Sequence, residues 1–184
     1  MNLAKKILTW YDNNKRILPW RISQNSKNNQ YYRLLSEFML QQTQVKTVIP
    51  YFKRFIKKIP NLQVLSKSKE KTVLKLWEGL GYYRRAKNLH KTSKILIERH
   101  EGKIPSNTEE LKELPGIGDY TANILLALIY NQPRIGLDGN VKRVLFRLFN
   151  NHLFNKKISF RTKRNSDLAE ALMEFGALIC QPKN

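Results

Sequence analysis

The chain has 184 residues, 41% of them hydrophobic and 26% charged, which is enough for one compact domain or two small lobes and excludes a largely disordered chain. Its formal net charge of +20 favours a polyanionic partner such as nucleic acid, although AT-biased coding would also enrich lysine. The single cysteine, Cys180, excludes an internal disulfide, and no stretch approaches the roughly 20 apolar residues of a membrane span.

Apolar residues recur at helical spacing along nearly the whole chain, beginning with a face formed by Leu3, Ile7, Leu8 and Tyr11. Proline in "LPW" (18–20) ends this first helix because it removes a backbone donor, and the polar stretch 21–30 is typical of a loop. The same periodicity predicts further helices at about 31–44, 45–58, 69–76, 82–100, 107–113, 119–131, 139–149 and 165–179. Because we find no convincing strand alternation, the predicted fold class is all-α.

Two local signals refine this prediction. Ser106 and Glu109 form a capping-box pattern that would fix the start of the helix at 107–113. No sharp linker is visible, but the segment 150–165 is the most polar connection in the second half of the chain. We expect it to be a flexible loop.

The stretch "LPGIG" joins two predicted helices through Pro115, Gly116, Ile117 and Gly118. Glycine accepts positive φ and lets another backbone come close, and the N-terminus of the following helix presents unpaired amides with a partial positive charge. Together these features predict a cradle for the phosphates of a nucleic-acid strand, whatever its base sequence. The alternative is an ordinary turn between two helices.

This stretch extends into "ELPGIGDYTANILLALIYNQPRIGLDGNVKRV", which resembles the helix-hairpin-helix DNA glycosylases with their hairpin, Gly- and Pro-rich loop and fixed aspartate. Further strings resemble the adenine-specific mismatch glycosylases, the MutY family: "LPWR" (18–21), "LSEFMLQQTQVKTVIPYFKRF" (35–55), "LWEGLGYYRRAKNLHK" (76–91) and "LDGNVKRV" (137–144). The resemblance covers essentially the whole chain. "MLQQTQV" and "GLGYYRRAKNLHK" are specific enough to separate this family from endonuclease III and from the thymine-mismatch enzymes of the same fold.

The resemblance implies the helix-hairpin-helix DNA glycosylase fold, with two helical lobes and the active-site cleft between them. Residues 21–131 would form a six-helix barrel lobe that includes the hairpin, and residues 1–20 with 132–184 would form the second lobe. The implied function is base excision repair by a monofunctional glycosylase, which flips adenine out of the duplex and hydrolyses its N-glycosidic bond.

The implied partner is double-stranded DNA with an A:8-oxoguanine or A:G mismatch, bound by a monomer. The sequence shows no signal peptide and no membrane span. We therefore expect a soluble protein of a reducing compartment, the cytoplasm, associated with the nucleoid.

Release of adenine requires a proton on the departing base and a negative charge near the sugar, and two carboxylates in different environments can supply both. Glu37 lies among apolar residues in "LLSEFML", where desolvation favours the protonated form that a general acid needs; the alternative is the solvent face of an amphipathic helix. Asp138 opens a helix, so it can also serve as an N-cap. The resemblance assigns Glu37 to protonation of adenine and later activation of water, and Asp138 to stabilisation or transient capture of the sugar cation.

The resemblance also places Tyr120 where bifunctional relatives carry a lysine that attacks the sugar, forms a Schiff base and breaks the strand. Tyrosine has no amine, so we expect base removal without lyase chemistry and Tyr120 packed near the deoxyribose. The alternative is a core aromatic residue. Asn140 matches a residue that makes a hydrogen bond in the same site.

A protein residue must fill the gap that a flipped base leaves. The string "GLGYY" is similar to the wedge loop of the family, with Tyr82 at the intercalating position, and Leu80 and Gln42 match neighbours that touch the widowed base. Trp20 and Arg21 match the rim of the adenine pocket, although each of these aromatic residues could also belong to the core. Candidate phosphate contacts, each otherwise a solvated cation, are Arg84, Arg85, Lys87, Lys142 and Arg143.

The chain departs from the family pattern at Cys180, where the family continues with three further cysteines that complete a [4Fe–4S] site. Here the sequence ends four residues later, at "QPKN", and one thiolate cannot hold a cluster that needs four, so we expect neither a cluster nor another metal. The C-terminal Nudix-like domain, which helps to recognise 8-oxoguanine, is also expected to be absent. Without the cluster the second lobe should be looser, and activity weak, absent or dependent on a partner fragment.

Three further expectations stay open. The loop before Glu37 is a few residues longer than usual in the family, which leaves the geometry between Trp20 and Glu37 undetermined. A non-catalytic module would bind DNA through the hairpin without turnover. A thymine- or pyrimidine-directed relative is disfavoured by "MLQQTQV".

Overall fold

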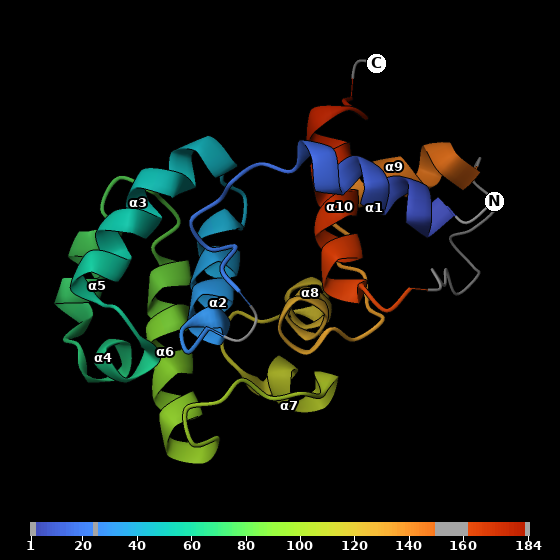
Figure 1. The fold of residues 1–184 in the computed structure, drawn as a ribbon. Coiled ribbons are helices and arrows are strands. Elements are labelled where there is room, and N and C mark those ends of the chain that lie inside the picture. Colours follow the sequence, from blue (N-terminus) through green and yellow to red (C-terminus); the bar gives the residue numbers. More distant parts are fainter. Residues whose placement is uncertain (1–2, 24–25, 150–161, 183–184) are drawn as a thin grey trace. The chain divides into compact units, whose positions relative to one another are not determined.

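The computed structural model describes residues 3–23, 26–149 and 162–182, and within these ranges every regular element is a helix (Figure 1). The all-α prediction is therefore confirmed. None of the described helices is both long enough and apolar enough to cross a membrane. In chain order the helices are α1 (Leu3–Asn14), α2 (Asn29–Leu40), α3 (Val45–Lys58), α4 (Leu62–Lys67), α5 (Glu70–Trp77), α6 (Arg84–Arg99), α7 (Thr108–Glu113), α8 (Asp119–Tyr130), α9 (Gly139–Phe149) and α10 (Asn165–Leu178).

Every helix that the periodicity predicts is present, and α4 is present without having been predicted. It has six residues, less than two turns, which is too short for a helical period to emerge from the sequence. The Asn61 side chain caps its start by accepting a hydrogen bond from the Val64 backbone N–H at 2.9 Å. Its buried residues are Leu62 and Leu65, and the helix packs against α6.

Several helix ends differ from the sequence prediction by a few residues: α1 ends at Asn14, before "LPW", and α6 begins at Arg84. Two of the differences have a clear local cause. α2 ends at Leu40 rather than near residue 44, because Gln42 adopts a φ of 56°, a left-handed conformation that cannot continue the helix. At the start of α7 the cap is Asn107, whose side chain accepts a hydrogen bond from the Glu110 N–H at 2.9 Å and donates to the Glu110 carboxylate at 2.6 Å. The capping pair therefore lies one residue beyond the predicted Ser106, because an asparagine carbonyl caps a helix as well as a serine hydroxyl does.

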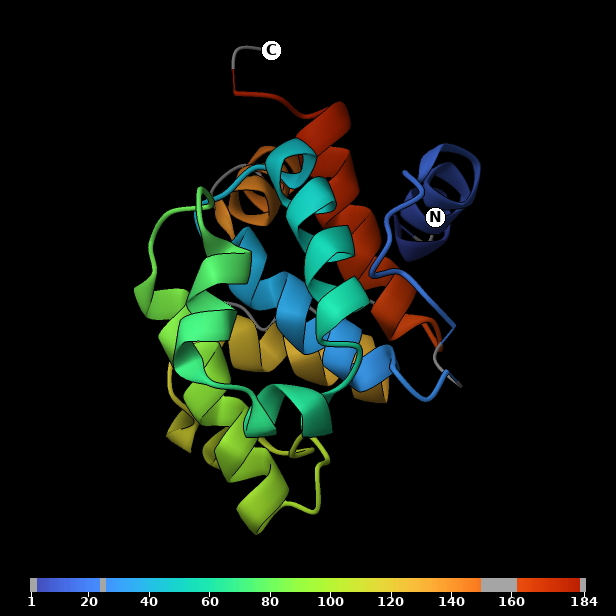
Figure 2. The same cartoon turned by 90° about the vertical axis from the view of Figure 1, so that its left-hand side faces the viewer.

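The described residues form two compact units. The continuous unit, Ile17–Gly118, contains α2 to α7. Within it α6 packs against α2, α4 and α5, and α3 packs against α2 and α5 (Figures 1 and 2). The core of this unit consists of fully buried apolar side chains, among them Leu34, Phe38, Phe52, Phe55, Trp77 and Leu89.

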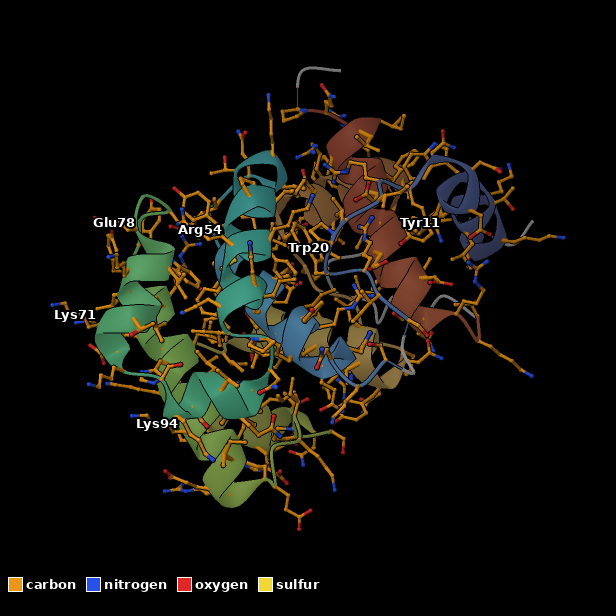
Figure 3. The ribbon with its side chains drawn as sticks, turned by 60° about the vertical axis from the view of Figure 1, so that its left-hand side comes forward. Tyr11, Trp20, Arg54, Lys71, Glu78 and Lys94 are labelled. Carbon is orange, nitrogen blue, oxygen red and sulfur yellow. The ribbon has the colours of Figure 1, made fainter. Side chains whose placement is uncertain are left out.

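The split unit joins Met1–Arg16 to Asp119–Asn184 and contains α1, α8, α9 and α10. α10 packs against each of the other three helices. Two buried carboxylates connect it to the N-terminal segment: Glu170 accepts a hydrogen bond from the Tyr11 hydroxyl, and Glu174 accepts hydrogen bonds from the Arg16 guanidinium at 2.8–3.2 Å. Figure 3 labels Tyr11 on the side of α1 that faces α10.

This division differs from the expected lobes at α8. The expectation places residues 119–131 in the lobe that contains the hairpin, whereas α8 packs against α10 and belongs to the split unit. The expected flexible loop, 150–165, lies outside the described residues over 150–161.

Candidate functional site

The loop between α7 and α8 has the backbone that the "LPGIG" motif predicts. Gly116 has a φ of 83°, and a Cβ at this position would lie 2.8 Å from Asn88 Nδ2 and 2.9 Å from Phe38 Cε1. Two carbonyls of the loop accept hydrogen bonds from side chains of the same unit. Thr92 Oγ1 donates to the Pro115 oxygen at 3.0 Å, and Gln41 Nε2 donates to the Gly116 oxygen at 3.3 Å. The fold itself therefore requires glycine at position 116.

The other two residues of the motif have different environments. The Ile117 side chain is 6% exposed and anchors the loop to the core. Gly118 is exposed, and a Cβ there would meet nothing within 4 Å. α8 begins at the next residue, Asp119, so its unpaired N-terminal amides follow Gly118 directly along the chain. The contact of this loop with phosphate stays a prediction.

The loop between α5 and α6 presents an aromatic side chain at its tip. Tyr82 is 63% exposed and has a φ of 47°, which is uncommon for a residue other than glycine. Trp77 stabilises the loop, because its Nε1 donates a hydrogen bond to the Gly81 oxygen at 3.1 Å. Leu80 is only 6% exposed, so its side chain belongs to the core in this structure. The wedge prediction agrees with the exposure of Tyr82 and stays a prediction.

Gln42, the third predicted probe of DNA, lies in the connection between α2 and α3. It is exposed and has a φ of 56°. Gln42 and Tyr82, the two exposed residues predicted to contact the bases, therefore both have a left-handed backbone conformation. Only the surrounding structure can maintain this conformation.

Glu37 lies in the second half of α2 and is 6% exposed. Its helical neighbours Leu34, Phe38 and Met39 are fully buried. The interpretation of Glu37 as a glutamate on the solvent face of an amphipathic helix is therefore excluded. A buried carboxyl group is a candidate general acid, because burial disfavours its charged form.

Asp138 is the N-cap of α9, as one of the two interpretations predicts. Its Oδ1 accepts a hydrogen bond from the Val141 N–H at 2.7 Å. The cap uses this one oxygen, and among the described residues Oδ2 has no hydrogen-bond partner. Asn140 is engaged within the split unit, since its Oδ1 accepts a hydrogen bond from Arg143 Nη2 at 2.7 Å.

Tyr120, in the first turn of α8, is half-buried within the split unit. Its hydroxyl lies 3.6 Å from the Met173 sulfur, and a Cβ at Gly136 would lie 2.8 Å from its Cε2. Tyr120 therefore packs against the core of the split unit without being fully buried in it. A role near the deoxyribose is compatible with it and stays a prediction.

Trp20 is 4% exposed and packs edge-on against Phe52, with ring centroids 5.3 Å apart. Figure 3 shows it beside α3, in the continuous unit. Arg21 follows it and is half-buried. The structure thus places Trp20 in the core, and the assignment of both residues to the rim of an adenine pocket stays a prediction.

The five candidate phosphate contacts have different environments. Arg84, Lys87 and Lys142 are exposed. Arg143 is engaged by its own unit, because its guanidinium donates at 2.7 Å to the carbonyls of Cys180 and Gly176. The prediction for Arg85 is wrong: it is 7% exposed, and its guanidinium is directed toward backbone carbonyls inside the continuous unit. The signal for this burial is present in the sequence, since Arg85 lies four and eleven residues before Leu89 and Leu96, on the apolar face of α6.

Comparison with known proteins agrees with this architecture. A family model described as HhH-GPD superfamily base excision DNA repair protein matches residues 35–169, most of the chain. The chain belongs to this superfamily. The similar structures of other HhH-GPD proteins include a thermostable thymine-DNA glycosylase, with a TM-score of 0.81 and 25% identity over 98% of this chain and 87% of that one. An endonuclease III–DNA complex, with a TM-score of 0.77 and 20% identity over 98% and 86% of the two chains, supports the fold alone.

Similar HhH-GPD proteins by sequence include adenine DNA glycosylases. That of Buchnera aphidicola subsp. Baizongia pistaciae is 44% identical over 189 residues, which cover 97% of this chain and 53% of that protein. That of Mus musculus is 39% identical over 194 residues, which cover 96% and 38% of the two chains. The chain spans about half the length of the bacterial relative.

The family resemblance implies a [4Fe–4S] cluster, and the donor set of this HhH-GPD chain does not fit one. Such a cluster takes four thiolates, and Cys180 is the single cysteine of the sequence. The Cys180 thiol is free, and its sulfur lies 3.3 Å from Arg147 Nη1. In the described part of the chain, no group of three or more His, Cys, Asp or Glu residues is placed to hold a metal ion.

Proposed function

We propose that this chain is a monofunctional adenine DNA glycosylase that hydrolyses the N-glycosidic bond of adenine mispaired with 8-oxoguanine or guanine. The observation that carries the proposal is the buried carboxyl group of Glu37, 6% exposed, in a chain whose relatives at 44% and 39% identity are adenine DNA glycosylases. Hydrolysis of this bond needs a proton donor for the departing base, and a desolvated carboxyl group suits that role.

In the proposed reaction Glu37 donates its proton to the adenine while the bond between the base and C1′ breaks. The bonding electron pair leaves with the base, and C1′ becomes an oxocarbenium-like cation. We assign stabilisation of this cation to the carboxylate of Asp138, and to its Oδ2 because Oδ1 caps α9. Water then adds to C1′, and the deprotonated Glu37 accepts a proton from that water, which restores the acid.

Glu37 belongs to the continuous unit and Asp138 to the split unit. Their action on one nucleotide is therefore part of the proposal. It is supported by the family membership and by the chemical need for an acid and an anion in different environments: Glu37 is buried, whereas Asp138 is partly exposed.

The proposed enzyme does not break the DNA strand. Tyr120 has no amine, so it cannot form the Schiff base on which lyase chemistry depends. Treatment of a reaction mixture with borohydride should therefore trap no covalent protein–DNA adduct. The partner is double-stranded DNA, with Tyr82 as the wedge and Gln42 as a contact to the widowed base. The protein acts as a monomer on nucleoid DNA in the cytoplasm.

The decisive test is single-turnover base release from a duplex with adenine opposite 8-oxoguanine. Glu37→Gln keeps the shape of the side chain and removes the titratable proton, so release should slow by about 100- to 10,000-fold. DNA affinity and the thermal unfolding midpoint should stay close to those of the parent. Equal rates for parent and variant would exclude Glu37 as the acid.

The same assay distinguishes the alternatives. DNA binding without release by the parent protein would indicate a non-catalytic binding module. Release of thymine or another pyrimidine, but not adenine, from a panel of mismatched duplexes would indicate a pyrimidine-directed enzyme.

A further inference from the structure

Arg85 lies in the first turn of α6, and the residue is 7% exposed. Its guanidinium is the group that makes the contacts. It donates hydrogen bonds to backbone carbonyls in two regions that are distant in sequence, the end of α2 with the loop that follows it and the loop between α5 and α6. Nη1 donates to the end of α2 and the residues that follow, and Nη2 donates to the loop between α5 and α6. The acceptors are the oxygens of Phe38 at 3.3 Å, Met39 at 2.8 Å and Gln41 for Nη1, and those of Leu80 at 3.4 Å and Gly81 at 3.2 Å for Nη2.

Each of these loops carries one of the two probing residues directly after a carbonyl that Arg85 binds. Gln42 follows Gln41 and has a φ of 56°, and Tyr82 follows Gly81 and has a φ of 47°. Left-handed backbone at such residues persists only where neighbouring contacts enforce it. Arg85 supplies such contacts to both loops from a single planar group.

Aromatic rings complete the surroundings of this cation. The Arg85 Cζ lies 5.6 Å from the centroid of Trp77 and 5.3 Å from that of Tyr82, within the range of cation–π attraction. The Trp77 indole also donates to the Gly81 oxygen at 3.1 Å. The wedge residue is therefore held both through the carbonyl before it and through its own ring.

The absence of a counter-ion distinguishes Arg85 from an ordinary structural ion pair. Among the described residues no carboxylate pairs with it, and burial lowers the pKa of the Arg85 guanidinium below its ordinary value. The partners of the buried charge are carbonyls, which bind Nη1 and Nη2, and aromatic rings, whereas Nε has no hydrogen-bond partner in the part of the chain that the structure describes. Lysine could not replace the planar fork that reaches both loops, because its ammonium is a point charge with three donors.

We propose that Arg85 is a positioning residue that couples the Gln42 loop to the Tyr82 loop, so that insertion of the wedge and contact with the base opposite the target occur together. The proposal rests on the proposed function for the roles of Gln42 and Tyr82. The coupling itself lies within the continuous unit and needs only the contacts given above. Its consequence is that Arg85, without contacting DNA, determines how sharply the enzyme discriminates among opposite bases.

The first experiment measures amide hydrogen exchange in the DNA-free protein. In Arg85→Lys, exchange should accelerate at least about tenfold in residues 40–44 and 79–83 together, while the rest of the continuous unit keeps its protection. The matched control is Tyr31→Phe, which removes another buried tether to a carbonyl, the 2.7 Å bond from Tyr31 to Ile59, and should leave both loops unchanged.

A second variant separates coupling from simple loosening. Trp77→Phe loses the indole donor to Gly81 and should accelerate exchange in 79–83 alone. If Arg85→Lys does not fold, Arg85→Gln serves in its place, since its shorter amide cannot reach both loops. Acceleration in only one loop, in neither, or uniformly across the continuous unit in the arginine variant would overturn the proposal.

The second experiment measures single-turnover adenine release opposite 8-oxoguanine and opposite cytosine. Arg85→Lys should reduce the ratio of the two rates at least about tenfold, as expected when a positioning contact is lost, while the pH dependence of the faster reaction keeps its shape. A uniform loss on both duplexes would contradict a role in discrimination. If the parent releases no adenine at all, the proposed function fails, and hydrogen exchange still decides whether Arg85 couples the loops.

Discussion

Asp138 combines two roles that a substitution can separate, the N-cap of α9 and the proposed anion opposite the sugar cation. In the parent the Val141 N–H donates to the Asp138 side chain at 2.7 Å. Asp138→Asn keeps a side-chain oxygen for this hydrogen bond, so the free energy of unfolding should change little. Loss of the negative charge should slow adenine release about 100-fold or more. Asp138→Ala should lose the same activity and also about 1 kcal/mol of stability. The prediction fails if Asp138→Asn releases adenine at the parent rate, as shown by single-turnover assays beside denaturant unfolding.

At the same scale, His90 should make stability depend on pH. Its side chain is 2% exposed, and its Nε2 has no hydrogen-bond partner among the described residues. Burial, and then the charge of Lys94, lower the pKa of His90 below its ordinary value of 6.5, against smaller opposing contributions from the Ser68 backbone and Glu70. Because the folded-state pKa is the lower one, the unfolded chain binds the proton more readily, and this contribution to stability is complete above pH 6.5 and is lost as the pH falls.

The measurement is the free energy of unfolding of the parent and of His90→Gln at pH 8 and pH 5. The stability difference between the two proteins should change between these pH values by about 1.4 kcal/mol for each unit by which the pKa is lowered, with the parent losing more on acidification. His100→Gln, which removes an imidazole 3.6 Å from the Glu110 carboxylate, controls for the loss of a histidine as such. A difference that is constant with pH would show that His90 does not titrate between the folded and unfolded states.

At the scale of the element, the two glycines of the hairpin loop differ in the room that the fold leaves for a side chain. Gly116 has a positive φ and no room for a Cβ, so Gly116→Ala should destabilise the fold, by about 1–3 kcal/mol. Gly118 has open space on the side where a Cβ would lie, so Gly118→Ala should cost less than about 1 kcal/mol. If the loop approaches a DNA strand closely, Gly118→Ala should nevertheless weaken duplex binding. Unchanged affinity of this stable variant, measured by fluorescence anisotropy, would place the phosphate contact elsewhere.

At the scale of the whole molecule, the formal net charge of +20 should make DNA binding strongly dependent on salt. Exposed cations occur on both units, for example Lys71 and Lys94 on the continuous unit, where Figure 3 shows them projecting from α5 and α6. The logarithm of the association constant should fall linearly with the logarithm of salt concentration, with a slope of about 0.9 for each phosphate contacted.

A pair of lysines in the split unit tests which cations contribute. Lys142→Ala should reduce the salt slope by about 1 if Lys142 contacts a phosphate, whereas Lys6→Ala on the exposed face of α1 should not. Both variants lower the net charge equally, so a difference between their slopes reports a local contact. Equal slopes for the two variants would refute a specific role for Lys142.

Residues whose environment is set by near neighbours could be predicted from the sequence. The apolar flanks of Glu37 indicated the burial that the structure confirms, and the position of Asp138 before an amphipathic run indicated the cap. Asn107 and α4 were missed because two adjacent polar residues compete for one cap and because six residues carry too little periodicity. Arg85 was misassigned because its spacing from Leu89 and Leu96, which marks the apolar face of α6, was not used; its acceptors, as far as 47 residues away along the chain, could be identified only from the structure.

The sequence by itself determined the class of the fold, the order of its longer helices and the superfamily, since these depend on a repeating apolar pattern and on contiguous motifs. Only the tertiary structure decided that Gly116 is required by Asn88 and Phe38, and that Gln42 and Tyr82 stand on left-handed backbone bound to one buried guanidinium. The physical reason is that hydrogen bonds and close packing act over a few ångströms in space, and a linear sequence does not record which distant residues come within that range.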